Sequence, residues 1–348
     1  MSFISQSSPH AHATNSTQKV MLTVAAATTP GFIALVYFFG VGVIINLALA
    51  IIFSLALEAL VLYLRKRPIK FYLSDCSALV TAILLGLALP PYSPWWLIFV
   101  GCIFSIVVAK QLYGGLGFNP FNPAMIGYVV LLISFPVNMT LWTAPVGFAN
   151  TPSLAEAFSS VFLNAPLDGY TGATPLDAFK QSQGETVAEI YQNESIFSDA
   201  VIAGAGWEWV NLGFLLGGLF LLWRKIFSWH APVAMLATLT VCSFLFYNGG
   251  SDSGAPVLTH LLSGATMLGA FFIITDPVSS AVSQKGRLIF GACIGLLVFM
   301  IRHFGNYPDA IAFAVLLMNF AAPFIDYYTL PRSYGHNKSR RATEKVDV

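Results

Sequence analysis

Residues 21–64 read MLTVAAATTPGFIALVYFFGVGVIINLALAIIFSLALEALVLYL, with Glu58 as their single charged side chain. A bilayer core of about 30 Å is crossed by roughly 20 apolar residues in a helix. This run is therefore too long for one span and suits two. We place the break near Gly40-Val41-Gly42, because glycines weaken a helix interior. The stretch predicts a helical membrane protein.

The composition of the whole chain agrees with that prediction. Of its 348 residues 56% are hydrophobic and 9% charged, and the mean hydropathy is +0.72. Since soluble proteins carry roughly 25% charged residues, so few charges cannot cover a water-facing surface of this size. We expect an all-α polytopic membrane protein of about ten helices. Beyond the first two spans, we predict helices near 73–90, 95–111, 122–136, 205–223, 230–247, 255–275, 286–303 and 308–326.

Charge and cysteine content exclude several classes of protein. The net charge is +1 and no basic stripe stands apart from the loops, which argues against a nucleic-acid partner. The four cysteines occur singly and form no CxxC pair, so we expect no iron–sulfur or zinc site held by this chain alone. Residues 1–20 have no apolar core before a small-residue cleavage site, and we predict no signal peptide.

The positions of lysine and arginine predict the orientation in the membrane. With both ends in the cytoplasm, 15 of the 17 fall in inside loops, and only Lys180 and Arg302 do not. This places residues 137–203 in the periplasm, where acidic side chains outnumber Lys180. The predicted division is a cytoplasmic tail (1–20), a first five-helix repeat (21–136), the periplasmic segment (137–203), a second repeat (204–328) and a cytoplasmic tail (329–348).

The repeat rests on two pairs of matching segments. Residues 77–91 (SALVTAILLGLALPP) and 263–277 (SGATMLGAFFIITDP) have equal length, begin with serine and end with proline. A polar break follows each at the same distance, at 119–123 (NPFNP) and 305–309 (GNYPD). Five spans separate the halves, so they must point in opposite directions, as in transporters with inverted repeats. Chance similarity between helices rich in small residues is the alternative.

Inversion predicts which breaks lie together. Residues 89–91 and 305–309 are expected on the periplasmic side, near the 137–203 segment, and residues 119–123 and 275–277 on the cytoplasmic side. Polar groups at membrane depth cost a few kcal/mol and are often functional. The candidates are Asn46, Glu58, Asp75, Thr81, Asn119, Asn122, Thr266, Asp276, Arg302, His303 and Asn319.

Two of these candidates have plain structural explanations. Glu58 lies seven residues before Arg65, about 10 Å at 1.5 Å per residue, so we expect it to snorkel toward that basic cluster. Asp75 is expected to pair with Lys70 at the membrane interface.

The one long polar segment contains Asp168-Gly169-Tyr170-Thr171-Gly172-Ala173-Thr174, followed by Pro175-Leu176-Asp177. Such residue types favour a turn, and here the turn would present a hydroxyl. The run resembles the Asp-x-x-Ser/Thr-Gly-Ala-Thr motif at which bacterial flavin transferases join FMN, through its phosphate, to the last threonine. The motif occurs in the RnfD and NqrB subunits of membrane electron-transport complexes. The resemblance implies covalent FMN on Thr174, with Asp168, Thr171, Gly172 and Ala173 as the rest of the motif.

A second Ser-Gly-Ala-Thr at residues 263–266 is the main decoy. It follows an apolar run, we place it inside a membrane helix, and a transferase could not easily reach it. Attachment in an extended polar loop is expected instead.

The resemblance to the NqrB/RnfD family covers essentially the whole chain. It includes Asp75-Cys76-Ser77-Ala78, the FNPFNPAM run at 118–125 and the Thr-Asp-Pro run at 275–277. No longer amino-terminal extension of the NqrB kind is present, which favours the RnfD branch. The family implies a fold similar to urea-channel-like proteins and a place in the Rnf complex of the bacterial inner membrane. That complex moves electrons between ferredoxin and NAD and couples them to ion translocation.

The family also implies a non-covalent riboflavin within the membrane. From the inverted pairing we place it near Asn119, Asn122, Pro123 and Asp276. Arg302 is expected either to form an interfacial ion pair with Asp309 or to contact a flavin phosphate or ring edge.

Expected partners are the other Rnf subunits, the flavin transferase and lipid. Two alternatives remain open: an NqrB-like subunit of a sodium-pumping quinone reductase, and a solute channel, which the inverted repeat alone would support. The acceptor threonine distinguishes a flavoprotein from a channel.

Overall fold

The computed structural model describes residues 16–148, 151–166, 169–182, 184–198, 200, 202–247, 254–305, 307 and 310–329. These residues are mainly helical, with one isolated antiparallel bridge between Thr143 and Thr171, and the all-α prediction is confirmed. The elements in the first part of the chain are α1 (Thr17–Ala27), α2 (Thr29–Phe39), α3 (Gly42–Leu64), α4 (Ile69–Leu73), α5 (Ser77–Ala88), α6 (Trp95–Cys102), the π-helix η1 (Ile103–Gln111) and α7 (Pro123–Ser134). Those of the polar segment are α8 (Pro136–Thr140), α9 (Leu154–Leu163), α10 (Pro175–Gln181), α11 (Val187–Asn193) and η2 (Ser195–Phe197). The last part contains α12 (Trp207–Trp223), α13 (His230–Phe246), α14 (Val257–Leu262), α15 (Thr266–Leu268), the π-helix η3 (Gly269–Ile273), α16 (Gln284–Phe304) and α17 (Ile311–Thr329).

Helix length and composition identify a multi-pass membrane protein. Four stretches are long and apolar enough to cross a membrane: α1 with α2, α3, α16 and α17. Shorter apolar helices occupy the other predicted runs: α5, α6 with η1, α7, α12 and α13. The predicted run at 255–275 is divided into α14, α15 and η3. The number of ten spans therefore stays a prediction.

The first predicted break lies where the glycines are. Helix α2 ends at Phe39, Gly40 adopts φ +83°, and α3 begins at Gly42. A Cβ on Gly42 would lie 2.6 Å from the ring of Tyr92. Both glycines are therefore needed, one for a left-handed backbone and one for a close approach.

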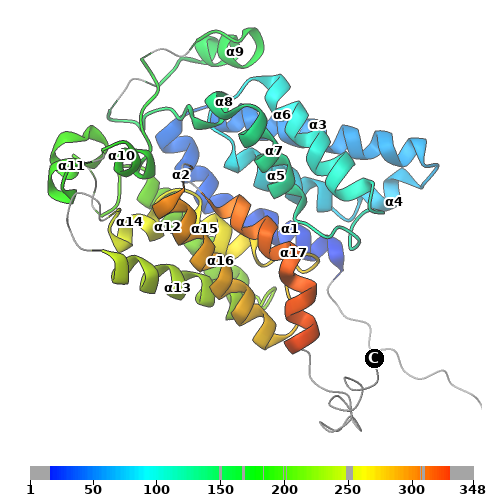
Figure 1. The fold of residues 1–348 in the computed structure, drawn as a ribbon. Coiled ribbons are helices and arrows are strands. Elements are labelled where there is room, and N and C mark those ends of the chain that lie inside the picture. Colours follow the sequence, from blue (N-terminus) through cyan, green and yellow to red (C-terminus); the bar gives the residue numbers. More distant parts are fainter. Residues whose placement is uncertain are drawn as a thin grey trace, which may run out of the picture.

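The two halves of the chain pack in matching pairs. Helix α12 packs on α2, and α17 packs on α7, so equivalent elements join the halves in both places (Figure 1). Helix α12 lies tightly against both α1 and α2, because a Cβ on Gly217 would lie 1.9 Å from the carbonyl oxygen of Ala27 in α1, and one on Gly213 would lie 2.8 Å from the Gly31 backbone in α2. Small residues let membrane helices approach closely. An inverted repeat would produce this pairing.

Two positions differ from the sequence prediction. Residues 263–265 do not lie inside a helix, because α14 ends at Leu262, Ser263 is extended and Gly264 has φ +60°, and Thr266 is the first residue of α15. Lys110 is not in a loop, because α6 continues into η1 and carries it to a buried position. Both errors have one cause: apolar spacing does not distinguish a straight helix from a broken or widened one.

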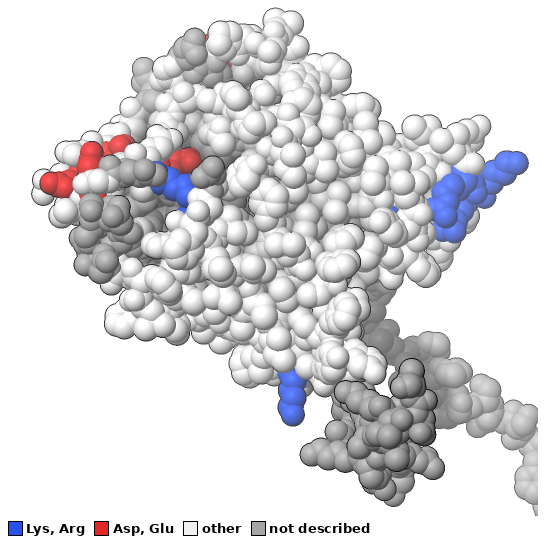
Figure 2. All heavy atoms as spheres, viewed as in Figure 1, with Lys and Arg blue, Asp and Glu red and all other residues white. Residues whose placement is uncertain are grey.

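Charged side chains gather at opposite ends of the molecule. Figure 2 shows acidic residues over α10 and α11, with a basic side chain beside them, and basic residues where α3 meets α4. A further basic side chain lies at the lower edge of this view, and the surface between is largely uncharged. We call these ends the acidic face and the basic face. This separation is the pattern expected of a chain whose apolar middle lies in a bilayer.

Candidate functional site

Thr174 forms the start of helix α10. It is the N-cap residue in extended conformation, Pro175 follows at the first helical position, and Asp177 completes a capping box. The Asp177 backbone N–H donates to Thr174 Oγ1 at 3.2 Å, and the hydroxyl donates to Asp177 Oδ2 at 2.6 Å. Thr174 is 8% exposed. The expectation of a loop that presents this hydroxyl is therefore wrong, because Thr174 caps a short helix and its side chain is nearly enclosed.

The residues before Thr174 are held against the strand-like segment at Trp142. Ala144 N–H donates to Tyr170 O at 2.8 Å, and Gly172 N–H donates to Trp142 O at 3.0 Å. A Cβ on Gly172 would lie 3.1 Å from the Cβ of Ala144, so the motif glycine allows this close pairing. Thr171 is exposed, whereas Thr174 is buried, and Ala173 connects them. Asp168 lies outside the described residues.

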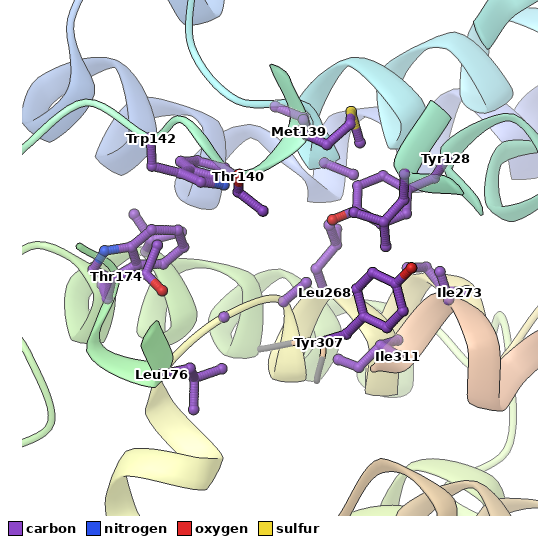
Figure 3. Close-up of a pocket in the computed structure, with 18 of the residues that line it drawn as sticks. Tyr128, Met139, Thr140, Trp142, Thr174, Leu176, Leu268, Ile273, Tyr307 and Ile311 are labelled. Carbon is purple, nitrogen blue, oxygen red and sulfur yellow. The ribbon is translucent and has the colours of Figure 1, made fainter. Parts of the chain in front are cut away.

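The Thr174 side chain borders a cavity that we call the first cavity. The space within it, counted with its open mouth, is about 940 Å³. Aromatic side chains from several parts of the chain line it, namely Tyr128, Trp142, Trp207, Phe214 and Tyr307. Figure 3 shows Thr174, Trp142 and Tyr307 around a common space. A flat aromatic ring would find apolar faces on several sides.

Lys180 ties α10 to the end of α16. Its ammonium donates to the carbonyl oxygens of Gly305 and, at 2.6 Å, Tyr307. Burial lowers the pKa of Lys180 to about 8, with the nearby Asp177 carboxylate opposing that change. Tyr307 also lines the first cavity. The structure thus brings the predicted break at 305–309 next to the Thr174 segment.

Arg302 has two partners that the sequence did not predict, and its predicted ion pair with Asp309 stays a prediction. Its guanidinium is buried and donates to His260 O at 2.7 Å and to Thr266 Oγ1 at 3.0 Å. It does not line the first cavity, and Asp309 lies outside the described residues. These bonds secure the break between α14 and α15, so a contact of Arg302 with flavin stays a prediction. Thr266 is fully buried, which makes it a poor acceptor for a second protein.

A second cavity opens between the two other predicted breaks. Asn119, Asn122, Pro123 and Asp276 all line it, although they come from opposite halves of the chain. Its volume is about 1190 Å³ with its mouth. The two breaks therefore lie together as predicted, and the inversion of the repeats stays a prediction.

The polar side chains of this cavity are partly used in local structure. The Asn122 side-chain oxygen accepts from the backbone N–H groups of Ala124 and Met125 and caps α7. Asp276 accepts from Ser279 Oγ at 2.7 Å and from Val278 N–H. The Asn119 amide donates to Phe121 O at 3.0 Å. These bonds fix the wall in place.

A buried ion pair lies behind the same wall, and the sequence pattern gave no sign of it. Lys110 Nζ lies 2.6 Å from Glu58 Oε1, and both side chains are 2% exposed. Lys110 also donates to Ser77 Oγ at 2.7 Å, and Gln111 donates to Glu58 Oε1. Glu58 does not snorkel to the basic cluster, because Lys110 meets it inside the protein. The predicted use of Asp75 also differs, because Asp75 accepts from Ser77 N–H and Oγ.

Fold and sites together define a polytopic all-α membrane protein with two interior cavities, one of them bordered by a threonine at a helix start. Comparison with known proteins is more specific. Residues 4–335 match the model of the NQR2, RnfD, RnfE family, and the chain belongs to that family.

Individual relatives are similar over nearly their full length. All three named here are the D component of an ion-translocating oxidoreductase complex. The protein of Cellvibrio japonicus is 55% identical over 99% of both chains. That of Ectopseudomonas mendocina is 59% identical over 95% of both chains. That of Citrobacter koseri is 52% identical over 97% of this chain and all of its own.

Proposed function

We propose that this chain is the flavin-carrying membrane subunit of an ion-translocating oxidoreductase complex. The names of its relatives support both the complex and its redox role. In this proposal FMN is attached to Thr174 and a riboflavin is held without a covalent bond. Electrons pass through the subunit between partners that link ferredoxin and NAD. The inner membrane is its location, with the acidic face toward the periplasm.

The position of Thr174 carries the proposal. Its hydroxyl stands at the edge of a cavity walled by Tyr128, Trp142, Trp207 and Tyr307. A flavin tethered there through its phosphate could place its ring between these side chains. The flavin supplies the electron chemistry, and the protein holds it, limits water and tunes its environment. Trp142 and Trp207 are braced by each other and by Phe39, with ring centroids 4.8 to 5.9 Å apart.

The relation between the two cavities supports electron transfer within the chain. Met125 and Ile273 line the first cavity, whereas their chain neighbours Ala124 and Ile274 line the second. Adjacent Cα atoms are about 3.8 Å apart, so the shared wall is about one residue thick at these places. Ring systems in the two cavities would be close neighbours. We place the riboflavin in the second cavity for this reason and because Asn119, Asn122 and Asp276 line it.

Maturation must accommodate the buried cap. Because the Thr174 hydroxyl is bonded to Asp177 and nearly enclosed, a flavin transferase cannot act on α10 as it is docked here. We infer that attachment precedes the docking of α10 or uses its local opening. A threonine hydroxyl also needs a base or a metal to become a nucleophile at neutral pH.

In-gel fluorescence tests the attachment site. The chain is co-expressed with a flavin transferase and run on a denaturing gel, where a phosphoester-linked flavin stays with the protein. We expect a fluorescent band from the wild type and none from Thr174→Val. Thr266→Val is the matched control and should keep the band. A band that persists in Thr174→Val would overturn the attachment site and the proposal built on it.

A further inference from the structure

The buried Lys110–Glu58 pair leaves hydrogen-bonding capacity unused on both side chains. Lys110 carries three N–H donors and uses two, on Glu58 and Ser77. No protein acceptor for the third is present in the described part of the chain, and Lys110 lines the second cavity. One donor of a buried cation is therefore available to a molecule in that cavity.

The partner of Lys110 is also incompletely satisfied. Glu58 Oε1 accepts from Lys110 and Gln111, while Glu58 Oε2 is buried without a hydrogen-bond partner. The side-chain oxygen of Gln111 is buried and unpartnered too. Buried polar atoms are normally paired, and exceptions are often functional. Since Glu58 does not line the cavity, it stands behind Lys110 as the counter-charge.

Local structure fixes this arrangement. The π-helix η1 carries Lys110 and Gln111 toward Glu58 on α3, and π-helical widenings are frequent at functional sites. Ser77 at the start of α5 receives the Lys110 bond and donates to Asp75 Oδ1 at 2.5 Å. The ammonium is thus held by three elements at the cavity wall.

We propose that Lys110 is a positioning and charge-compensating residue for the redox group of the second cavity, with Glu58 setting how much of its charge the cavity experiences. The inference rests on the proposal that this cavity holds a flavin. An electron entering the cavity brings one negative charge into a region of low dielectric, where a nearby ammonium stabilises it strongly. The oxidised, uncharged ring gains less. Lys110 therefore raises the reduction potential, and Glu58 moderates that effect.

Two variants of opposite sign test the inference. The full chain is purified in detergent with Thr174→Val, so that no covalent flavin contributes, and the remaining flavin is titrated potentiometrically. Glu58→Gln leaves the ammonium uncompensated and should raise the potential. Glu58→Gln with Lys110→Met leaves a neutral pair and should lower it. We expect the ratio of affinities for reduced and oxidised flavin to change at least tenfold each way, equivalent to about 59 mV for one electron.

The controls distinguish an effect specific to the Lys110–Glu58 pair from the absence of such an effect and from a second cavity that holds no flavin. Lys285→Met removes one charge from the exposed start of α16 and should leave the potential unchanged. Shifts of both test variants in the same direction, or within twofold of wild type, would overturn the role of the pair. Flavin content gives an independent reading: denaturation should release flavin from the Thr174→Val chain, and Val80→Trp, which fills the second cavity, should reduce the amount. Absence of releasable flavin would refute the cavity occupant itself.

Discussion

Single residues in the Thr174 motif have two separable roles. Thr174 caps α10 through its side-chain oxygen, and we propose that the same oxygen carries FMN. A phosphoester keeps this oxygen but removes its hydrogen, so the bond donated to Asp177 Oδ2 is lost on attachment. The cap's acceptor function, from Asp177 N–H, can persist.

Replacement by asparagine separates the roles at this position. Asparagine caps helices at least as well as threonine, whereas loss of a cap costs about 1 kcal/mol. Made without the transferase, Thr174→Asn should unfold at the wild-type temperature; made with the transferase, it should carry no flavin. Thr174→Val should be both less stable and free of flavin. Fluorescence of Thr174→Asn on a denaturing gel would contradict the assignment of the hydroxyl as acceptor.

Among the elements, α10 carries a lysine whose contribution to the stability of the fold changes with pH. Lys180 donates to carbonyl groups at the end of α16, and burial lowers its pKa to about 8, against about 10.4 in an unfolded chain. Between these values the unfolded chain binds the proton more tightly than the folded chain. Stability contributed by this residue is therefore least below pH 8 and rises as pH increases toward about 10.

Thermal unfolding at about pH 7.5, 8.5 and 9.5 measures this contribution. The free energy of unfolding of the wild type should rise with pH relative to that of Lys180→Met. The rise should be smaller than the full difference between the folded and unfolded pKa values of one lysine would give, because Lys180 is only partly buried. Lys285→Met serves as a control for a surface lysine. Parallel curves for wild type and Lys180→Met would show that the proton on Lys180 is not linked to folding.

The packing of α12 on the first part of the chain depends on glycines, which have no side chain. A Cβ at position 217 would overlap the carbonyl oxygen of Ala27, so Gly217→Ala must displace the backbone of one helix. Overpacking of this kind costs about 1–3 kcal/mol. We expect a clear fall in unfolding temperature in detergent. Leu216→Ala, at a 62% exposed neighbour, should have a small effect, and equal effects would argue against a tight interface.

For the whole molecule, the separation of charge predicts the orientation. The acidic face carries α10 and α11, and the basic face carries the end of α3. In a chain without its native cysteines, Ser182→Cys should react with an impermeant thiol reagent in intact cells, and Ser339→Cys should react only after lysis. Labelling of position 339 alone in intact cells would invert the topology.

Local properties of the sequence were enough to predict the membrane class, the break at Gly40-Val41-Gly42 and the nearness of the polar breaks at 119–123 and 275–277. Each follows from apolar length, glycine conformation or a motif of fixed spacing. Thus Asn119 and Asp276, far apart in the chain, line one cavity as their places in the repeat predict.

Only the tertiary structure shows which polar side chains pair inside the protein. Apolar periodicity could not reveal that Lys110 turns inward in a π-helix, so its pair with Glu58 was missed, and Glu58 was assigned to the membrane surface instead. Likewise, the motif around Thr174 indicated a turn but not that its hydroxyl would be enclosed by a cap and an aromatic cavity. Burial and pairing depend on elements distant in sequence, and the free energy of a buried charge depends on the partner that the fold provides.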